Sequence, residues 1–403
     1  MSHTTIDNRL PSSRAQGVVA RAAMFALLAC IATATTVAQG ATASESSPTT
    51  RLYIVAYGEG RSDGIYMAEL ALDTGELRLV DLVAPLKNAA YLAIHPNRQY
   101  LYAACEVGDY VDSHGGGIAA LKIDAATGKL TPLNSKSSAG ANPCYISFDR
   151  QGKHALVANY DGGNVAVLPI DVDGRLGASS STMRAEGSSV NKSRQAGPHP
   201  HAICLDPADR LAFVPDLGLD QIIIYRFNAE TGELAPSDPT VLPSAPGAGP
   251  RHFVFYPNGR WAYAINELDS TITTLKFDAD AGLLTPLGVT STRPLGSDAD
   301  NITAEIEIHP NGRFLYSSNR GDDTLAMFAI NSATGELTSL GHHSAGGCTP
   351  VSFSIDPTGK YLLSANQDSN GVVVHEIDVA SGTLAQTSHE VRVRRPVCIQ
   401  FAP

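Results

Sequence analysis

The residues most able to do chemistry in this chain lie at the ends of short apolar runs. In the segment GPRHFVFYPNGRWAYAINE (residues 249–267), Arg251 begins one run and Glu267 ends the next. Alternating apolar residues on either side of Asn-Gly, which readily adopts positive φ, predict two strands joined by a tight turn. This hairpin brings Arg251 and Glu267 to the same end. A guanidinium and a carboxylate fixed together there indicate either a structural ion pair or an anion-binding or catalytic site.

The frame of this hairpin recurs along the chain at intervals of about fifty residues. Each unit has an apolar strand, a turn near Pro-x-Gly-Arg, a second strand ending near Asn, a third strand and a turn near Thr-Gly-Glu-Leu. The first turn and second strand occur at residues 95–106, 149–160, 206–217, 256–267, 309–320 and 356–367. A repeat of this length with four short strands is typical of a β-propeller blade.

The two ends of the repeat region complement each other. Residues 52–57, 64–72 and 76–83 supply a second, third and fourth strand without a first, and residues 396–402 supply a first strand with nothing after it. Together they complete one blade, which is closed by the C-terminal strand, and this pairing removes exposed sheet edges. The chain is therefore predicted to be an all-β, seven-bladed β-propeller over residues 51–403.

Positions that break the repeat are the candidates for function. The turns share one design and mark a structural face, so chemistry is expected on the opposite face, where first strands begin and second strands end. The catalytic candidates there are His201, Glu267, Arg251 and Arg320, and the substrate-binding candidates are His199, His252, Glu305 and Gln367. Three long connections, residues 177–197, 237–249 and 290–303, are predicted above this face, as lids or as tolerated surface loops.

The composition is that of a globular protein without a nucleic-acid signature. The chain has 403 residues, of which 43% are hydrophobic and 17% are charged, so it has a core to bury. Its formal net charge of −11 argues against nucleic acid or an anionic membrane as a general partner. An anionic small molecule at a local basic site stays possible. Because a closed propeller needs no partner to fold, a monomer is expected.

Residues 1–43 have the features of a cleaved secretory signal peptide. Three arginines precede a small, apolar run at residues 22–38, and Ala41-Thr42-Ala43 fits a cleavage site. Residues 44–50 are predicted to be a linker. The mature protein is expected to be secreted or periplasmic with no membrane span, and lipoprotein anchoring at Cys30 stays open.

The cysteines predict neither a disulfide framework nor a metal site. Five remain after the leader, an odd number with irregular spacing and no CxxC motif. They are predicted to be small buried residues inside strands: Cys105, Cys144, Cys204, Cys348 and Cys398. Because HExxH and GxSxG motifs are also absent from the sequence, no metal, cofactor or nucleophilic serine is expected.

Four stretches resemble the lactonase family of seven-bladed propellers, which includes the 6-phosphogluconolactonases and the carboxymuconate-cyclising enzymes. They are GPHPH (residues 197–201), the hairpin at residues 249–267, AEIEIHPNGRFLYSSNRGDDT (residues 304–324) and SANQDSN (residues 364–370). The resemblance covers about residues 51–403. It implies a metal-free site formed by a histidine of GPHPH together with Arg251, Glu267 and Arg320.

The resemblance implies hydrolysis of a sugar lactone by general acid–base catalysis. Glu267 or His201 would deprotonate water, and Arg251 and Arg320 would bind an oxyanion, a carboxylate or a phosphate. Because a leader exports the protein, the substrate is expected to be an unphosphorylated aldonolactone or another exported lactone rather than a cytoplasmic sugar phosphate.

Two alternatives to a lactonase stay open. One is a muconate-type cycloisomerase, in which the same groups handle a dicarboxylate. The other is a non-catalytic periplasmic propeller that binds a ligand or a protein. An Arg251–Glu267 pair locked together without space for a ligand would favour the binding protein, whereas an open pocket shared with His201 and Arg320 would favour an enzyme.

Overall fold

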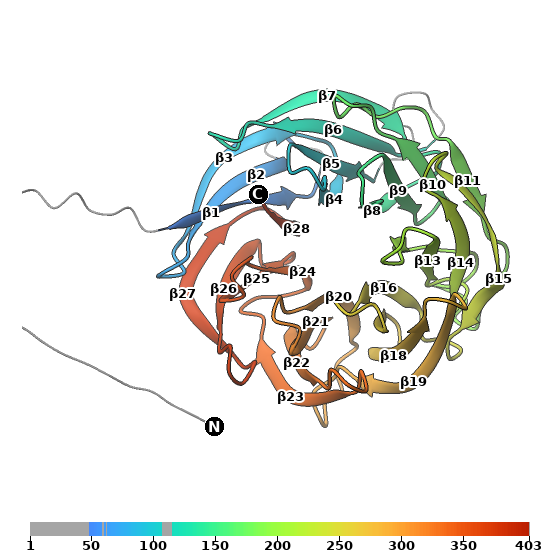
Figure 1. Ribbon diagram of the computed structural model, residues 1–403. Helices are drawn as coiled ribbons and strands as arrows, with labels where there is room; N and C mark the ends of the chain where they lie inside the picture. Colours follow the sequence, from blue (N-terminus) through green and yellow to red (C-terminus); the bar gives the residue numbers. More distant parts are fainter. Residues whose placement is uncertain (1–47, 59, 62, 107–114, 403) are drawn as a thin grey trace, which may run out of the picture. The chain divides into compact units, whose positions relative to one another are not determined.

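The computed structural model describes residues 48–58, 60–61, 63–106 and 115–402. These residues form twenty-eight strands in seven four-stranded antiparallel sheets, which are arranged as blades around a common centre (Figure 1). The predicted signal peptide, Cys30 and most of the predicted linker lie outside the described residues. Within those residues, the structure contains no helix with the length and apolar character needed to cross a membrane.

We number the blades from the one that contains the first strand of the chain, and list strands from the centre of the ring outward. Blade 1 contains β28 (Pro396–Phe401), β1 (Thr49–Ala56), β2 (Gly64–Ala71) and β3 (Leu77–Pro85). Blade 2 contains β4 (Ala89–Ile94), β5 (Tyr100–Cys105), β6 (Gly117–Ile123) and β7 (Leu130–Ser137). Blade 3 contains β8 (Pro143–Phe148), β9 (His154–Asn159), β10 (Asn164–Pro169) and β11 (Ser181–Arg184).

The remaining four blades follow in chain order. Blade 4 contains β12 (Cys204–Leu205), β13 (Leu211–Asp216), β14 (Gln221–Asn228) and β15 (Glu233–Pro243). Blade 5 contains β16 (Pro250–Phe255), β17 (Trp261–Asn266), β18 (Thr271–Asp278) and β19 (Leu283–Ser291). Blade 6 contains β20 (Ile302–Ile308), β21 (Phe314–Arg320), β22 (Thr324–Ile330) and β23 (Leu337–Ser344). Blade 7 contains β24 (Pro350–Ile355), β25 (Tyr361–Asn366), β26 (Gly371–Ile377) and β27 (Leu384–Arg392).

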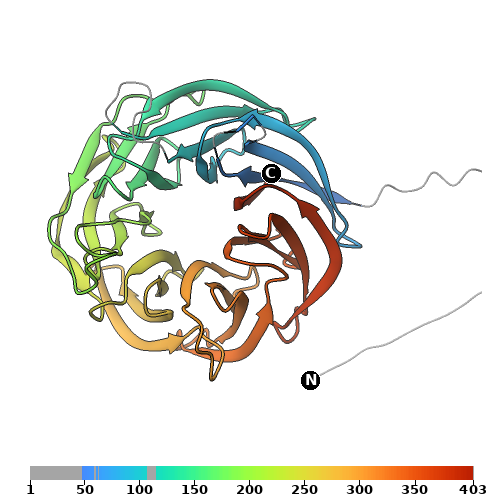
Figure 2. The same cartoon turned by 180° about the vertical axis from the view of Figure 1, so that it is seen from behind.

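The two ends of the propeller meet in blade 1, as the complementary ends of the repeat predicted. Strand β28 pairs antiparallel with β1, and the ladder joins Leu52 to Phe401 and Ile54 to Ile399. The blue and red strands lie side by side from both sides of the molecule (Figures 1 and 2). The prediction of a seven-bladed propeller closed by the C-terminal strand is confirmed. Strand β1 begins at Thr49, two residues before the predicted start of the domain.

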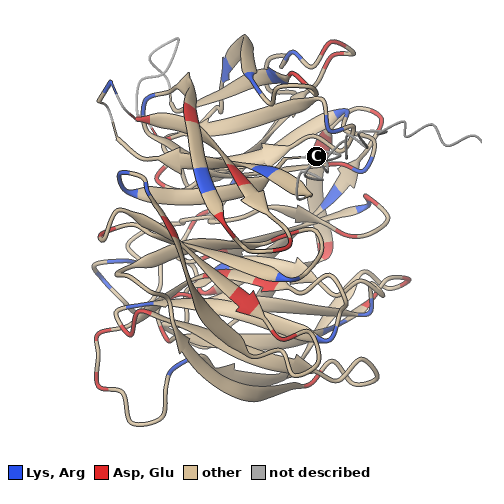
Figure 3. Cartoon of the chain, turned by 90° about the vertical axis from the view of Figure 1, so that its left-hand side faces the viewer, with Lys and Arg blue, Asp and Glu red and all other residues tan. Residues whose placement is uncertain are grey.

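The core lies between neighbouring blades, which explains the strand sequences. Second strands such as β5, β17 and β25 are buried along their whole length, so they appear in the sequence as continuous apolar runs. The outer strand β15 instead alternates between buried or half-buried and exposed residues. Basic and acidic residues are interspersed on the side of the propeller drawn in Figure 3, not gathered into one patch.

A tyrosine hydroxyl joins neighbouring blades at four places. The tyrosine lies on a second strand and donates to the carbonyl of the glycine in the Thr-Gly-Glu-Leu turn, or its equivalent, of the next blade. The pairs are Tyr53–Gly128, Tyr102–Gly174 and Tyr263–Gly335, each at 2.8 Å, and Tyr316–Gly382 at 2.9 Å. Gly335 has φ of +76°, and a Cβ there would lie 2.8 Å from the Trp261 ring. The recurring glycine is therefore required by backbone conformation and by space.

Two expectations about local structure were wrong. Cys348 lies exposed outside the strands, because it belongs to the connection before β24, whereas the other four cysteines lie in strands. The three long connections contain more strand than expected. Residues 177–197 include β11, the fourth strand of blade 3, and β15 and β19 extend into the other two.

We predict that Tyr263→Phe lowers the free energy of unfolding by about 1–3 kcal/mol, because the buried Gly335 carbonyl loses its partner. Urea unfolding measures this loss. Tyr53 lies in a different, non-adjacent blade, so the loss in a Tyr53→Phe/Tyr263→Phe double variant is expected to equal the sum of the single losses within about 0.5 kcal/mol. A single loss below about 0.5 kcal/mol would contradict a stabilising role for this hydrogen bond.

Candidate functional site

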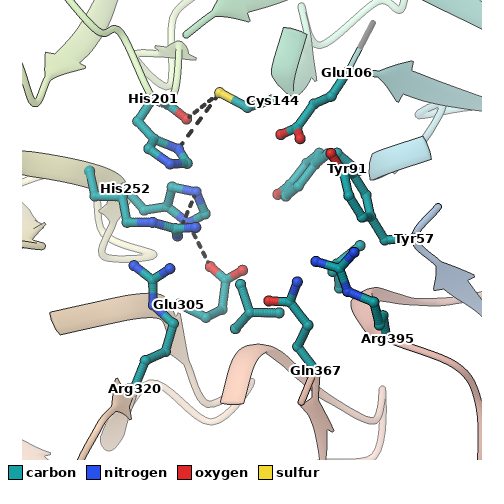
Figure 4. Close-up of a pocket in the computed structure, with 14 residues that line it drawn as sticks. Tyr57, Tyr91, Glu106, Cys144, His201, His252, Glu305, Arg320, Gln367 and Arg395 are labelled. Carbon is teal, nitrogen blue, oxygen red and sulfur yellow. Dashed lines mark hydrogen bonds and ion pairs between the residues drawn. The ribbon is translucent and has the colours of Figure 1, made fainter. Parts of the chain in front are cut away.

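A cavity of about 280 Å³ lies at the centre of the ring, where first strands begin and second strands end. This volume lies just below the usual range of about 300–1,000 Å³ for small-molecule sites and suits a ligand the size of a monosaccharide. All seven blades contribute to its lining (Figure 4), which consists of Tyr57, Ala90, Tyr91, Glu106, Cys144, His201, Arg251, His252, Glu305, Arg320, Val351, Gln367, Arg395 and Val397.

Bulges at the start of the first strands direct side chains into this cavity. In blade 5 the ladder joins Pro250 to Asn266 and His252 to Ile265, so Arg251 is skipped. A bulge bends the strand and changes the direction of a side chain. Cavity-lining residues are skipped in the same way in four other blades: Ala90, Cys144, Val351 and Val397. The residue type at this one position therefore sets much of the chemistry of the cavity.

The guanidinium of Arg251 is fixed by three partners. Its Nε donates to Glu267 Oε2 at 3.0 Å, and its Nη1 donates to the Ala304 carbonyl at 2.7 Å. The same Nη1 lies over the His252 ring, 3.1 Å from Nε2 and 3.5 Å from Nδ1. Burial lowers the pKa of His252, so the ring carries a single proton, and that proton lies on Nδ1 because the facing Glu305 carboxylate can only accept. That proton is donated to Glu305 Oε1 at 2.8 Å. His252 is therefore neutral and links Arg251 to Glu305.

Glu267 is shared by three arginines. Its carboxylate contacts Arg251 Nε at 3.0 Å, Arg320 Nη2 at 2.9 Å and the Nη2 group of Arg194. It is only 2% exposed and does not line the cavity. Burial would raise the pKa of Glu267, but Arg320, Arg251 and Arg194 outweigh this effect and lower the pKa to about 2. Glu267 therefore holds guanidinium groups in place as a permanently ionised carboxylate.

Arg320 also lines the cavity and keeps an unused donor. Its Nη2 donates to the Thr303 carbonyl at 2.7 Å, in addition to its ion pair with Glu267. Its Nε is buried and has no hydrogen-bond partner in the part of the chain that the structure describes. A buried donor without a partner costs free energy, which a bound acceptor can recover.

His201 lines the cavity, whereas His199 packs beside it. The Sγ atom of Cys144 lies 3.7 Å from His201 Nδ1. Burial lowers the pKa of His201 well below its usual value, and Arg251 acts in the same direction, so the imidazole is neutral at neutral pH. The His199 ring stacks on Tyr160, with ring centroids 4.4 Å apart, and its Nδ1 lies 3.0 Å from the Tyr160 carbonyl.

The side of the cavity that faces the histidines carries further polar residues that the sequence analysis did not select. Figure 4 places Glu106, Tyr57 and Arg395 there, and the Arg395 guanidinium lies over the Tyr57 ring, 5.1 Å from its centroid. Glu106 holds the same position of the repeat as Glu267, at the end of a second strand. The repeat could therefore have identified it as a residue of the site. Arg395 immediately precedes β28, a position with positive φ that Asn88, Asn142, Gly249 and Thr349 hold before the first strands of blades 2, 3, 5 and 7.

Comparison with known proteins places the chain in a family. The family described as "Lactonase, 7-bladed beta-propeller" matches residues 51–401. The chain belongs to this lactonase family. Its resemblance to seven-bladed lactonases is thereby confirmed.

Relatives of this lactonase-family chain carry related names. A 6-phosphogluconolactonase of Bacillus subtilis is 34% identical over 75% of this chain and 83% of the relative. The 6-phosphogluconolactonase of Formosa agariphila is 33% identical over 72% of this chain and 82% of the relative. The solved structure of the Pseudomonas aeruginosa periplasmic gluconolactonase PpgL has a TM-score of 0.82 and 30% identity, over 88% of this chain and 99% of that one. These names agree with the prediction of a lactone-hydrolysing enzyme.

The structure brings most of the site residues predicted from the sequence into one cavity. Six of them line it: His201, Arg251, His252, Glu305, Arg320 and Gln367. Glu267 lies behind the arginines, and His199 packs on Tyr160. Within the described residues, no three His, Cys, Asp or Glu side chains are grouped as they would be to hold a metal ion.

The insertion before β12 adds an arginine that no repeat position predicts. Arg194 contacts Glu267, and its Nη2 also donates to the Tyr160 hydroxyl at 3.3 Å. The neighbouring Gln195 donates to the Leu217 carbonyl at 2.9 Å and accepts the N–H of Asn191 at 2.9 Å. These contacts hold the end of the insertion at residues 177–197 beside the site.

We predict that Glu267→Gln costs about 3–5 kcal/mol of unfolding free energy at pH 7, because three guanidinium groups lose their buried counter-charge. The carboxylate has a lowered pKa, so its stabilisation is complete above about pH 4.5 and is lost as the pH falls through about 2. The variant is therefore expected to lose less stability than the wild type between pH 5 and pH 2. Urea unfolding at several pH values measures both effects.

The control for this prediction is Glu69→Gln. Glu69 also pairs with two arginines, Arg51 and Arg78, but its side chain is 27% exposed. Surface ion pairs contribute about 0–1 kcal/mol, so the control is expected to lose little. Equal losses in the two variants would contradict a special role for the buried carboxylate.

Proposed function

We propose that this protein hydrolyses a sugar lactone by metal-free general acid–base catalysis in the central cavity. The observation that carries the proposal is the wall on which a neutral imidazole and two fixed guanidinium groups meet. His201, His252 and Arg320 lie on this side in Figure 4, and Arg251 lies over the His252 ring. Such a wall supplies a base and positive charge next to each other.

The chemistry follows from the properties of these groups. Water attacks the lactone carbonyl carbon, and His201 accepts a proton from it. The carbonyl oxygen gains negative charge, which Arg251 and Arg320 stabilise through hydrogen bonds already oriented by Glu267 and His252. Glu267 suits a positioning role better than that of a base, because three arginines contact its carboxylate and it does not line the cavity.

Several observations support an unphosphorylated aldonolactone as the substrate. The predicted signal peptide at residues 1–43 would export the protein to the periplasm, away from cytoplasmic sugar phosphates. The cavity has a volume suited to one sugar ring. The similarity to a protein named periplasmic gluconolactonase points the same way. We infer that the mature protein works as a monomer, without a cofactor, a nucleic-acid partner or a membrane span.

One observation favours a muconate-type cycloisomerase as a second candidate. Arg395 lies on the side of the cavity away from His252 (Figure 4), so cationic groups face each other and could hold the two ends of a dicarboxylate. A muconolactone in the substrate panel tests this reading. If neither reaction occurs, the non-catalytic binding propeller is the reading that remains.

The first test is a proton-release assay on the mature protein with glucono-1,5-lactone, 6-phosphogluconolactone and a muconolactone. We expect turnover of the unphosphorylated sugar lactone, unchanged by a chelator. Arg251→Ala is expected to lower kcat/KM by about 10²–10³-fold through loss of oxyanion stabilisation. His201→Asn is expected to lower kcat by about 10²–10⁴-fold through loss of the base.

Matched controls for this assay are Arg226→Ala, on the outer part of blade 4, and His389→Asn, on the outer strand β27. Both residues lie outside the cavity lining, so both variants are expected to keep wild-type activity. Wild-type turnover no faster than the spontaneous rate on every lactone would overturn the proposed function. Inhibition by the chelator would overturn its metal-free mechanism.

A further inference from the structure

Opening a lactone ring requires two proton transfers at different oxygen atoms. One proton leaves the attacking water, and another must reach the ring oxygen when its bond to the carbonyl carbon breaks. Glu267 is ionised and lies outside the cavity lining. Glu305 already accepts hydrogen bonds from His252 Nδ1 at 2.8 Å and from the Ile306 N–H at 3.1 Å. Neither carboxyl group selected from the sequence is therefore suited to supply the second proton directly.

Glu106 is placed to supply that proton. It follows β5 directly and lines the cavity, and its backbone N–H donates to the Asn88 carbonyl at 2.8 Å. Figure 4 shows the carboxyl group of Glu106 and the imidazole of His201 on opposite sides of the cavity, with Cys144 between them at one edge. A lactone ring between these two groups would present a different oxygen to each.

The groups that face Glu106 come from three blades. They are Tyr57 from the end of β1, Cys144 from β8, Asp161 after β9 and Arg251 from β16. Burial raises the pKa of Glu106, and Asp161 adds to the increase, whereas the Tyr57 hydroxyl and Arg251 oppose it. The carboxyl group is therefore protonated to a higher pH than an ordinary glutamate.

Glu106 and His201 are shifted in opposite directions by the same cavity. The pKa of His201 is lowered and that of Glu106 is raised, each chiefly by burial. These shifts favour the protonated form of Glu106 and the neutral form of His201, which are the forms that a general acid and a general base need before the reaction. The protonation of these two residues and their positions on opposite sides of the cavity therefore both favour His201 as the base and Glu106 as the acid.

We propose that Glu106 is the general acid of this site and protonates the ring oxygen of the lactone while His201 deprotonates the attacking water. This inference rests on the proposed lactonase function and adds a catalytic residue to it. The Tyr57 hydroxyl, which hydrogen-bonds the Glu106 carboxyl group, is a positioning residue.

The proton and electron balance of the step is complete. The water oxygen bonds to the carbonyl carbon as one water proton passes to His201. The bond between the carbonyl carbon and the ring oxygen then breaks, its electron pair stays on the oxygen, and the Glu106 proton neutralises the resulting alkoxide. Transfer of the proton from His201 to Glu106 through solvent restores both groups. The product carboxylic acid ionises, so the net reaction releases the one proton that the assay detects.

The pH profile of kcat tests this proposal on a lactone that the wild-type protein hydrolyses. We expect wild-type kcat, corrected for spontaneous hydrolysis, to fall at high pH as Glu106 ionises. Glu106→Gln is expected to lower kcat by about 10²-fold or more, with little change in KM, and to remove this alkaline decline. Glu106→Asp is expected to retain the decline at a reduced kcat.

Tyr57→Phe provides a second, independent readout. Its hydroxyl favours the ionised form of Glu106, so its removal is expected to move the alkaline decline to higher pH. Circular dichroism and thermal unfolding confirm that each variant folds. A Glu106→Gln protein that keeps most of the wild-type kcat, or keeps the same alkaline decline, would overturn the proposal. If the wild-type protein hydrolyses no lactone, the proposed lactonase function is overturned, and not only the role of Glu106.

Discussion

The site depends on one buried carboxylate that neutralises three guanidinium groups. Glu267 joins Arg251 from blade 5, Arg320 from blade 6 and Arg194 from the insertion before blade 4. A charge buried this deeply is tolerated only when it is paired, so none of these groups can move without exposing another to an unfavourable environment. One negative charge among three positive charges also leaves a net positive region beside the cavity. The interaction therefore fixes the geometry of the arginines and makes the cavity suitable for an anion or a developing oxyanion.

Ring closure explains why functional side chains meet at one face. Each blade begins close to the centre, and in six of them a bulge near that start turns a side chain inward. The residue there is small or apolar in blades 1, 2, 3 and 7, and is Arg251 in blade 5. Because the pairing of the first and second strands skips this residue, a substitution there changes the cavity and leaves the strand pairing of the blade intact. The opposite face carries the tyrosine–glycine hydrogen bonds that join the blades, so chemistry and blade stability are separated in space.

The repeat made the fold predictable, because each turn needs a particular residue and the two chain ends supplied complementary strands. It also located most of the cavity, since aligned repeat positions converge when a ring closes. The repeat does not predict which charged side chains pair with one another or how deeply each is buried. The frame brought Arg251 and Glu267 together. The contacts of Glu267 with Arg320 and Arg194 come instead from the neighbouring blade and from an insertion, and they leave Glu267 unsuited to act as a base. Glu106 held an equivalent position and was passed over, because nothing local shows that its carboxyl group would lack an arginine partner.

The contrast between Glu106 and Glu267 shows how one frame position can give two kinds of carboxyl group. Both end a second strand, and burial acts on both by disfavouring the charged form. Three arginines overcome this effect at Glu267, whereas at Glu106 a tyrosine hydroxyl and a more distant arginine do not. The same desolvation also keeps His201 uncharged. The raised pKa of Glu106 and the uncharged imidazole of His201 therefore both disfavour an ion pair between them, so both groups remain able to exchange protons with a bound molecule.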